Sequence, residues 1–390
     1  MKILVSQIKQ SFNNISVSGL VGQMFVLGLI FYGSYFLLLT TQENLTARGI
    51  DSGFKFLNSE AGLPISDSLI EYSPAKSYGT AFLVGILNTL FVSFIAIIFA
   101  TILGVIVGVG RTSKNWVISK VSAFFVETLR NIPLLLTLLF IYTVALGTLP
   151  RAKTPFNPIE GVFLSRRGLY LPDPIAHDGF GLVVAAFFAA IAIAYFFTKW
   201  AKKLQIRTGR ALPKTLISLL VIIVLPLLVF FILGKPMSLE YAELKGFNFV
   251  GGIVLKPEFS ALLLGLILYT AAYIGENVRS GLQSVPAGQI EAARALRVPK
   301  SVIIRKVLLP QALRVTIPAT TNDYTSLVKN SSLAVAIGYP DMVSIGGTII
   351  GQNGQAIEII AMWMAVYMTI NLIISALMNW LNSRVQIVER

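Results

Sequence analysis

The sequence of 390 residues contains no cysteine, and it contains a single histidine, His177. Without cysteine the chain can form no disulfide, no thiolate nucleophile and no cysteine-based metal site. Charged residues are also scarce, at 13% of the chain, whereas hydrophobic residues make up 55%. Because so few polar side chains cannot cover the surface of a soluble protein of this length, the composition excludes a soluble globular fold.

The sequence also lacks the short motifs of several large classes of catalytic sites. It has no G-x-x-x-x-G-K-[ST] run, and therefore no phosphate-binding loop for ATP. It has neither an H-E-x-x-H nor a G-x-S-x-G motif. We therefore expect no catalytic residue, no metal ligand and no cofactor in this chain, and we expect any energy source to lie in a partner.

Long apolar runs account for the hydrophobic content, and the mean hydropathy of the chain is +0.75. A run of about 20 apolar residues is long enough to cross a bilayer as a helix. The runs predict an all-α, polytopic membrane protein with about eight transmembrane helices. These lie near residues 20–40, 80–109, 121–147, 180–198, 215–234, 259–282, 316–334 and 356–382. In the second run, Gly104 and Gly108 form a small-x-x-x-small pattern that favours close helix packing.

The net charge is +14, and its distribution indicates a membrane protein rather than a nucleic-acid-binding one. With eight spans, both termini lie on one side of the membrane. If that side is the cytoplasm, inner segments hold 20 of the 32 basic residues, and outer segments hold 10 of them with 11 of the 18 acidic residues. This asymmetry obeys the positive-inside rule and predicts an N-in, C-in topology. The inner connection at 199–214 is strongly basic, and we expect it to lie on anionic lipid.

The stretch at 284–314 is basic and amphipathic, and it separates two apolar runs. Pro286 can open a helix, because its missing N–H is not needed in the first turn. Pro299 restricts Val298 to extended conformations, so a first short helix at 289–296 should stop there. A second short helix fits 300–308 and should end at Pro310. We predict a helix, a turn and a helix at the cytoplasmic membrane surface.

This stretch resembles the EAA loop of ATP-binding-cassette (ABC) importer permeases, through Glu291-Ala292-Ala293, Leu296 and the run Leu309-Pro310-Gln311-Ala312-Leu313-Arg314. In that family the loop docks into a groove on a separate ATPase subunit. The resemblance implies ATPase-coupling roles for Gln289, Glu291, Ala292, Ala293, Leu296, Arg297 and Pro310. Arg297 stands where the family usually has glycine, and a left-handed non-glycine residue costs roughly 1 kcal/mol. The alternative for the stretch is a solvated basic loop.

Two separated blocks carry the resemblance to polar amino-acid permeases. The first, at 85–139, includes Asn88-Thr89-Leu90 and Glu127-Thr128-Leu129-Arg130-Asn131-Ile132-Pro133. The second begins at Tyr273-Ile274-Gly275-Glu276-Asn277 and includes Lys329-Asn330-Ser331-Ser332. The resemblance implies a type I ABC importer permease core of five spans, enlarged as in the larger permease subunit of general L-amino-acid importers.

The resemblance also divides the chain into parts. Residues 1–78 add an N-terminal span and an outer loop. Residues 79–147 form the first part of the permease core, with two helices. Residues 148–258 are an insertion with outer loops and two spans. Residues 259–390 form the second part of the core, with three helices and the EAA loop at 284–314.

The implied function is that of a permease subunit of an ATP-driven amino-acid importer in the bacterial inner membrane. Its partners would be ABC ATPase subunits that hold ATP and Mg²⁺, a second and different permease subunit, and a periplasmic amino-acid-binding protein. A second hypothesis is an ion-coupled secondary transporter of small polar solutes, which would use buried acids as ion sites and need no ATPase.

Ionisable residues within predicted spans are costly in a bilayer and are therefore candidates for function. Glu127 and Arg130 lie three residues apart and can pair on one helix face, and Glu276 repeats this spacing with Arg279. The candidate substrate-pathway residues are Glu127, Arg130, Glu276, Asn322, Asp323, Lys329, Ser331 and Ser332. The alternative is structural pairing that only satisfies buried charge.

Overall fold

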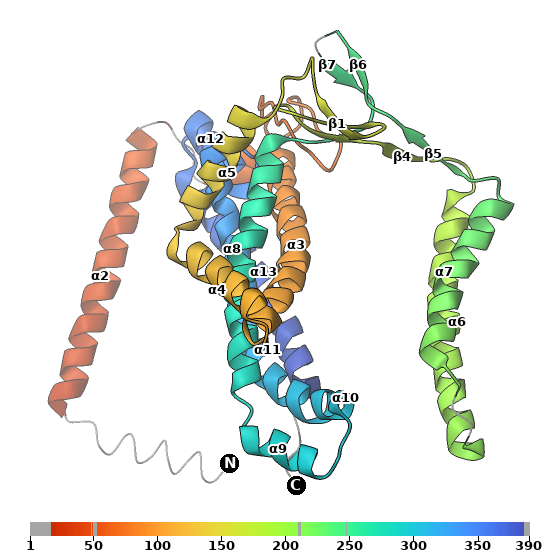
Figure 1. The fold of residues 1–390 in the computed structure, drawn as a ribbon. Helices are drawn as coiled ribbons and strands as arrows, with labels where there is room; N and C mark the ends of the chain where they lie inside the picture. The colour runs from red at the N-terminus through yellow and green to blue at the C-terminus, as the bar shows by residue number, and fades with distance from the viewer. Residues whose placement is uncertain (1–16, 48, 50–52, 210–211, 247, 386–390) are drawn as a thin grey trace. The chain divides into compact units, whose positions relative to one another are not determined.

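The computed structural model describes residues 17–385, except 48, 50–52, 210–211 and 247 (Figure 1). The chain ends at 1–16 and 386–390, whose cytoplasmic location the sequence predicts, lie outside the described residues. The chain forms two compact units. One contains the residues up to Asn131 and those from Leu266 onward, and the other runs from Ile132 to Gly265. The second unit includes the whole of the predicted insertion at 148–258.

The first unit is helical. The boundary between the units falls within α8, whose residues from Leu266 onward belong to the first unit. Its elements are α2 (Val17–Ala47), η1 (Phe54–Asn58), α3 (Tyr78–Arg111), α4 (Trp116–Asn131), α8 (Pro257–Gln283), α9 (Ala287–Ala295), α10 (Lys300–Ile303), η2 (Ile304–Leu308), α11 (Leu309–Asn330), η3 (Ser331–Ile337), α12 (Met342–Asn353) and α13 (Ala356–Val385). In the described chain, six helices are long and apolar enough to cross a membrane, and two broken helix pairs raise the number to eight if each pair crosses once. The predicted polytopic helical fold is confirmed.

The close packing predicted for Gly104 and Gly108 is confirmed where α3 meets α8. A Cβ atom added at Gly104 would lie 2.7 Å from the Cβ of Ile274, and one added at Gly108 would lie 2.6 Å from the carbonyl oxygen of Gly275. Ala100, Ala271 and Ile274 are fully or almost fully buried in the same contact. Because both glycines lack a side chain, the two helix backbones approach closely.

The broken region at 338–341 is tied to α3 by the Asn88-Thr89 pair. The Asn88 side-chain amide donates to the carbonyl of Pro340 over 2.9 Å, and the Thr89 hydroxyl accepts from the backbone N–H of Met342 over 3.0 Å. The Asp341 side chain caps α12 by accepting from the N–H of Ser344. The segment from α10 to η3 and α12 meet at 54° across this break. Side chains therefore satisfy the backbone groups that the break frees.

The span predicted at 121–147 is not one continuous helix, because two helices occupy it. α4 ends at Asn131, and α5 (Leu134–Thr148) begins after Pro133. Proline lacks the N–H that would continue the helix, and it drives the preceding Ile132 out of helical conformation.

The helix pair predicted at 284–314 is confirmed in its first half and wrong in its second. α9 ends with Arg297 at φ 54°, the left-handed turn that the sequence predicts there. The second helix does not stop at Pro310. It passes through the π-helical turn η2 into α11, with Pro310 in the first turn of α11. The wider π turn makes room for the proline ring, which would otherwise clash with the preceding turn.

In its described residues, the second unit contains α5, α6, α7 and eight short strands that the sequence analysis did not predict. The strands are β1 (Phe156–Ile159), β2 (Val162–Ser165), β3 (Gly168–Leu171), β4 (Asp173–Ala176), β5 (Met237–Glu240), β6 (Glu243–Lys245), β7 (Asn248–Val250) and β8 (Ile253–Leu255). They form an antiparallel sheet in the order β1-β2-β3-β8 and the two-stranded pairs β4-β5 and β6-β7. Strands of three or four residues carry too few alternating side chains to be recognised by their pattern.

A helical hairpin extends from the β4-β5 pair. α6 (Phe180–Thr208) follows β4, and α7 (Lys214–Ile232) precedes β5, so the two paired strands hold the hairpin at its open end. The two helices lie side by side (Figure 1). Ala190, Ala194 and Ala201 are the buried residues of α6, and they lie on one face of it.

Candidate substrate pathway and coupling surface

A polar cavity of about 300 Å³ lies between α8 and α11, in the first unit. Its lining residues are Tyr269, Thr270, Tyr273, Asp323, Ser326 and Asn330. They contribute one carboxylate, one amide and several hydroxyl groups. A cavity with a few convergent polar groups is the typical form of a small-molecule site.

Asp323 is the charged residue of this lining, and Asn277 on α8 holds it in place. The Asn277 side-chain amide donates to Oδ2 of Asp323 over 2.6 Å. The next residue on α11, Tyr324, points away to α3, where its hydroxyl lies 2.7 Å from the Thr101 hydroxyl. The contacts of these two neighbours fix the rotation of α11 and direct the carboxylate towards α8.

Two tyrosines form the α8 side of the cavity. The hydroxyls of Tyr269 and Tyr273 lie 3.1 Å apart, and their ring centroids are 4.9 Å apart. The exposed guanidinium of Arg130 lies over the Tyr273 ring, 5.2 Å from its centroid. This is a cation–π contact. It places a positive charge beside a cavity that contains a carboxylate.

The structure corrects the predicted pairing of Glu127 with Arg130. Glu127 instead lies 3.6 Å from Arg111, which ends α3 and also pairs with Glu276. The predicted pairing of Glu276 with Arg279 is confirmed, with an Nε–Oε2 distance of 3.0 Å. Arg111, which the sequence places in a loop, thus bridges carboxylates of α4 and α8. The Arg130 guanidinium contacts the Tyr273 ring instead of Glu127.

The other candidate pathway residues on α11 and η3 lie outside the cavity lining. Asn322 and Lys329 are exposed. The Ser331 hydroxyl donates to the carbonyl of Val328 over 2.8 Å, and the Ser332 hydroxyl donates to that of Lys329 over 2.7 Å. Both serines therefore satisfy carbonyls near the end of α11. Of the polar residues predicted in the seventh span, only Asp323 reaches the cavity, because a helix turns its successive residues through 100°.

The sequence analysis missed Tyr269, Thr270, Tyr273, Ser326 and Asn330 as candidate pathway residues. Their spacing in the sequence indicates that they share helix faces. Tyr269, Tyr273 and Asn277 recur every four residues on α8, and Asp323, Ser326 and Asn330 lie three and four residues apart on α11. Each set therefore lies on one face of its helix.

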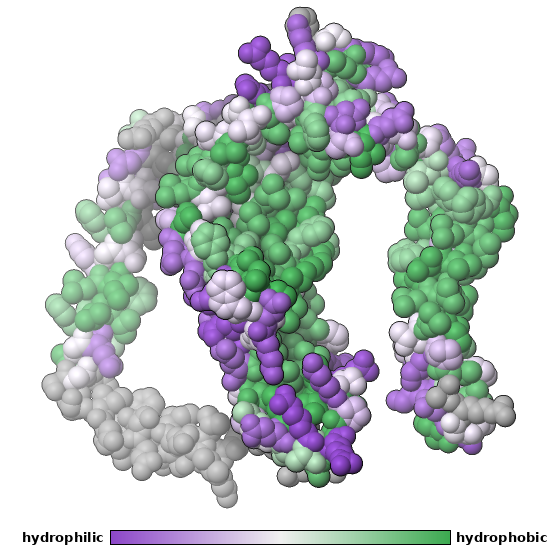
Figure 2. All heavy atoms as spheres, in the orientation of Figure 1, coloured by the Kyte–Doolittle hydropathy of each residue, from purple (hydrophilic) through white to green (hydrophobic). Residues whose placement is uncertain are grey.

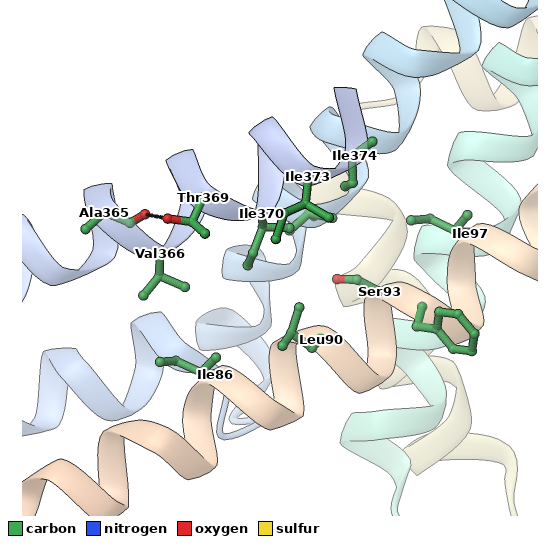
Figure 3. A pocket seen from close by; sticks show the side chains of 12 residues that line it. Ile86, Leu90, Ser93, Ile97, Ala365, Val366, Thr369, Ile370, Ile373 and Ile374 are labelled. Carbon is green, nitrogen blue, oxygen red and sulfur yellow. Dashed lines mark hydrogen bonds between the residues drawn. The ribbon is translucent and has the colours of Figure 1, made fainter. Parts of the chain in front are cut away.

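A second cavity in the same unit has a different character. It has a volume of about 500 Å³ and lies between α3 and α13 (Figure 3). Its lining residues are Ile86, Leu90, Ser93, Phe94, Ile97, Val328, Ala365, Val366, Thr369, Ile370, Ile373 and Ile374. The Thr369 hydroxyl is engaged by the carbonyl of Ala365, so the lining offers little to a charged solute. It is a poor candidate for a polar pathway.

The predicted coupling residues gather on and around α9. Gln289, Glu291 and Ala292 are exposed, and Ala293 is half-buried. Leu296 is 78% exposed. The side-chain amide of Gln311 donates to Oε1 of Gln289 over 2.6 Å and so links α9 to α11. This bond joins α9 to the helix that carries Asp323.

Arg297 closes α9 in a complete Schellman motif. Its N–H donates to the carbonyl of Arg294, and the N–H of Val298 donates to the carbonyl of Ala293. These two hydrogen bonds define the motif, and Arg297 has the left-handed conformation that the motif requires. Pro310, the last of the predicted coupling residues, is half-buried at the start of α11.

The sequence is similar to known proteins over most of its length. Residues 206–387 match the family model "Binding-protein-dependent transport system inner membrane component". The chain is 48% identical to the putative amino-acid ABC transporter permease protein YhdX of Escherichia coli, over 90% of this chain and 89% of YhdX. It is 44% identical to the general L-amino acid transport system permease protein AapQ of Rhizobium johnstonii, over 90% and 88% of the two chains.

A third relative and a solved structure extend the comparison. The permease protein BztB of a glutamate/glutamine/aspartate/asparagine transport system in Rhodobacter capsulatus is 36% identical, over 94% of this chain and 93% of BztB. A crystal structure of an amino acid ABC transporter with histidines superimposes with a TM-score of 0.46 at 20% identity, over 79% of this chain and 95% of the other. On the strength of the three full-length relatives, this chain belongs to the family of amino-acid ABC transporter permeases.

Proposed function

We propose that this chain is the membrane-spanning permease subunit of an ATP-driven amino-acid importer. The observation that carries the proposal is the full-length similarity to permeases of amino-acid transport systems, at 48% and 44% identity. Family membership favours this function over an ion-coupled secondary transporter. The chain would carry no catalytic residue and no cofactor of its own, since it lacks a phosphate-binding loop.

The polar cavity supports a pathway for a zwitterion. The Asp323 carboxylate is suited to accept from the substrate ammonium group, and the Arg130 guanidinium beside Tyr273 is suited to donate to the substrate carboxylate. The hydroxyls of Tyr269 and Ser326 can replace part of the water that the substrate loses. A site that holds the groups common to all amino acids, and leaves the side chain loosely held, would accept many of them.

The exposed α9 surface supports coupling to an ATPase. ATP and Mg²⁺ would bind to that partner, and closure of two ATPase subunits would move α9 and, through Gln289 and Gln311, α11. A periplasmic amino-acid-binding protein would deliver substrate at the outer side. We further propose a heterodimer with a second, different permease, located in the bacterial inner membrane with both termini inside, because the charge asymmetry of the loops obeys the positive-inside rule.

The test is transport by the complete complex. The chain is purified with its co-encoded proteins and reconstituted in proteoliposomes, and uptake of a panel of amino acids is measured with ATP inside or outside. We expect uptake to require ATP and the binding protein. Uptake driven by a proton or sodium gradient without ATP would contradict the proposal and favour a secondary transporter.

Asp323→Asn tests the pathway within the same complex. It keeps the size of the side chain and removes its charge, so we expect lower uptake of neutral and cationic amino acids with normal assembly and basal ATPase activity. Thr321→Ala on the same helix is the matched control, because the Thr321 hydroxyl donates to the carbonyl of Ile317 within its own helix. If Asp323→Asn abolishes assembly and the residual uptake keeps its substrate profile, Asp323 is structural.

A further inference from the structure

The helical hairpin of α6 and α7 carries a concentration of positive charge that the proposed transport function does not use. The sequence has no aspartate or glutamate between Asp178 and Glu240, a stretch that includes the whole hairpin. The same stretch holds Lys199, Lys202, Lys203, Arg207 and Lys214 around the connection of the two helices, with Arg210 outside the described residues. No acidic side chain of the hairpin is present to neutralise this charge.

The four cations of α6 lie on one face. At 100° per residue, Lys199, Lys202, Lys203 and Arg207 fall within an arc of about 140°. Ala190, Ala194 and Ala201, the buried residues of α6, lie on the opposite side. The alanine face packs against α7, so the cationic face points away from the hairpin, and its four side chains are exposed.

The register of the hairpin places this face at the edge of a bilayer. α7 has 19 residues and a length of about 29 Å, close to the hydrocarbon thickness of a membrane. The Thr198 hydroxyl lies 3.2 Å from the Ser218 hydroxyl, which sets Thr198 near the start of α7. The last ten residues of α6, from Lys199 to Thr208, then extend about 9 Å beyond the first residue of α7. They leave the apolar core and enter the headgroup region.

Aromatic residues mark the same boundary. Tyr195, Phe196 and Trp200 are each more than half exposed, and they immediately adjoin the first lysine. Nζ of Lys199 lies 4.6 Å from the centroid of the Tyr195 ring. Exposed aromatic rings followed by basic residues are typical of the membrane–water interface. Figure 2 shows hydrophobic residues along the hairpin and hydrophilic residues at the end that carries the connection.

We propose that this cationic face, at the end of α6, binds the phosphate groups of anionic phospholipids such as phosphatidylglycerol. Charge complementarity favours this ligand, since a cluster of basic side chains at headgroup depth attracts anionic lipid. The exposed aromatic and aliphatic residues beside the cluster contact the acyl chains of the same lipids. The hairpin thus anchors the second unit in an annulus of anionic lipid, a role separate from substrate transport.

The absence of cysteine makes a clean test possible. Ile206 is 77% exposed and lies in the centre of the cationic arc, so Ile206→Cys accepts a single fluorescent label. The full-length labelled chain is placed in nanodiscs that contain equal mole fractions of phosphatidylglycerol and phosphatidylcholine, one of which carries bromine on its acyl chains. We expect brominated phosphatidylglycerol to quench the label about threefold more than brominated phosphatidylcholine, and we expect salt to reduce the difference.

Further variants test whether the positive charge of the hairpin causes the preference for phosphatidylglycerol. Replacement of Lys199, Lys202, Lys203 and Arg207 by glutamine should abolish the preference and leave quenching by phosphatidylcholine unchanged, which shows that the hairpin is still inserted. Replacement of the three lysines by arginine should keep the preference. If the four-glutamine variant fails to insert, Lys202→Gln with Lys203→Gln should still reduce the preference. Equal quenching by both lipids in the parent protein, or loss of quenching when the ATPase and second permease are added, would overturn the proposal.

Discussion

The side-chain amide of Asn277 holds the carboxylate of Asp323 at 2.6 Å, and this bond joins α8 to α11 at the wall of the polar cavity. It occupies Oδ2 of the carboxylate. The other oxygen can then face the cavity, in an orientation that α11 alone would not fix. The proposed pathway therefore depends on a residue that does not itself line the cavity.

Asn277→Ala should weaken substrate handling. Hydrogen bonds to charged groups contribute about 1.5–3 kcal/mol, so the lower end of that range corresponds to about tenfold in affinity. We expect about a tenfold higher KM for amino-acid uptake in proteoliposomes, with basal ATPase activity retained. Thr325→Ala is the control, because the Thr325 hydroxyl bonds within its own helix to Asn322. An unchanged KM in Asn277→Ala would refute the positioning role.

Gly108→Ala should destabilise the contact of α3 with α8. The added Cβ would lie 2.6 Å from the carbonyl oxygen of Gly275 and 2.7 Å from Cβ of Val278, and overpacking of this kind costs about 1–3 kcal/mol. We expect a lower melting temperature of the full-length chain in detergent.

The matched control for Gly108 is Gly347→Ala in α12. Among the described residues, no atom lies within 4 Å of a Cβ built at Gly347, outside its chain neighbours and the nearby backbone of its helix. The added methyl group should be tolerated there, and the better helix propensity of alanine should raise stability by up to about 1 kcal/mol. Equal effects at the two glycines would show that close packing is not the cause.

Arg297→Gly should stabilise the turn after α9. Arg297 has φ 54°, which costs a residue with a Cβ roughly 1 kcal/mol relative to glycine. Slower amide hydrogen exchange at Val298, whose N–H closes the Schellman motif on Ala293, would report the gain. Arg297→Val should have the opposite effect, since a β-branched residue is strongly disfavoured at positive φ. Faster exchange at Val298 in the glycine variant would contradict this account.

Ala293→Arg should uncouple the permease from its ATPase. Ala293 is half-buried on α9, and a large charged side chain there would prevent close docking in a groove. We expect loss of complex assembly or of substrate-stimulated ATPase activity, with an unchanged melting temperature of the isolated chain. Gly288→Ala, where the described residues leave open space around a Cβ, serves as the control. Normal stimulated ATPase activity and uptake in Ala293→Arg would exclude a docking role.

The sequence by itself determined the class of this protein, because apolar runs and basic loops are local properties that follow directly from side-chain chemistry. The runs at 80–109, 180–198 and 356–382 became helices, and the EAA motif placed α9 correctly. The helix break at Pro133 also follows from the sequence, because proline has no N–H to continue the helix. The apolar pattern alone does not show this break, because it continues across Pro133. Strands as short as β6 and β7 contain too few residues to show the alternation of side chains by which a strand is recognised.

The partners of the charged side chains in the predicted spans were decided only by the tertiary structure. Spacing predicted the Glu276–Arg279 pair correctly and the Glu127–Arg130 pair wrongly, although each pair lies three residues apart on one helix. Glu127 instead lies near Arg111 on another helix, and the Arg130 guanidinium lies over the Tyr273 ring. The polar cavity formed in the same way, from Asp323 on α11 and tyrosines on α8 that lie about fifty residues earlier. The rotation of each helix about its axis selects which of its side chains meet, and packing contacts such as those of Gly104 and Gly108 set that rotation.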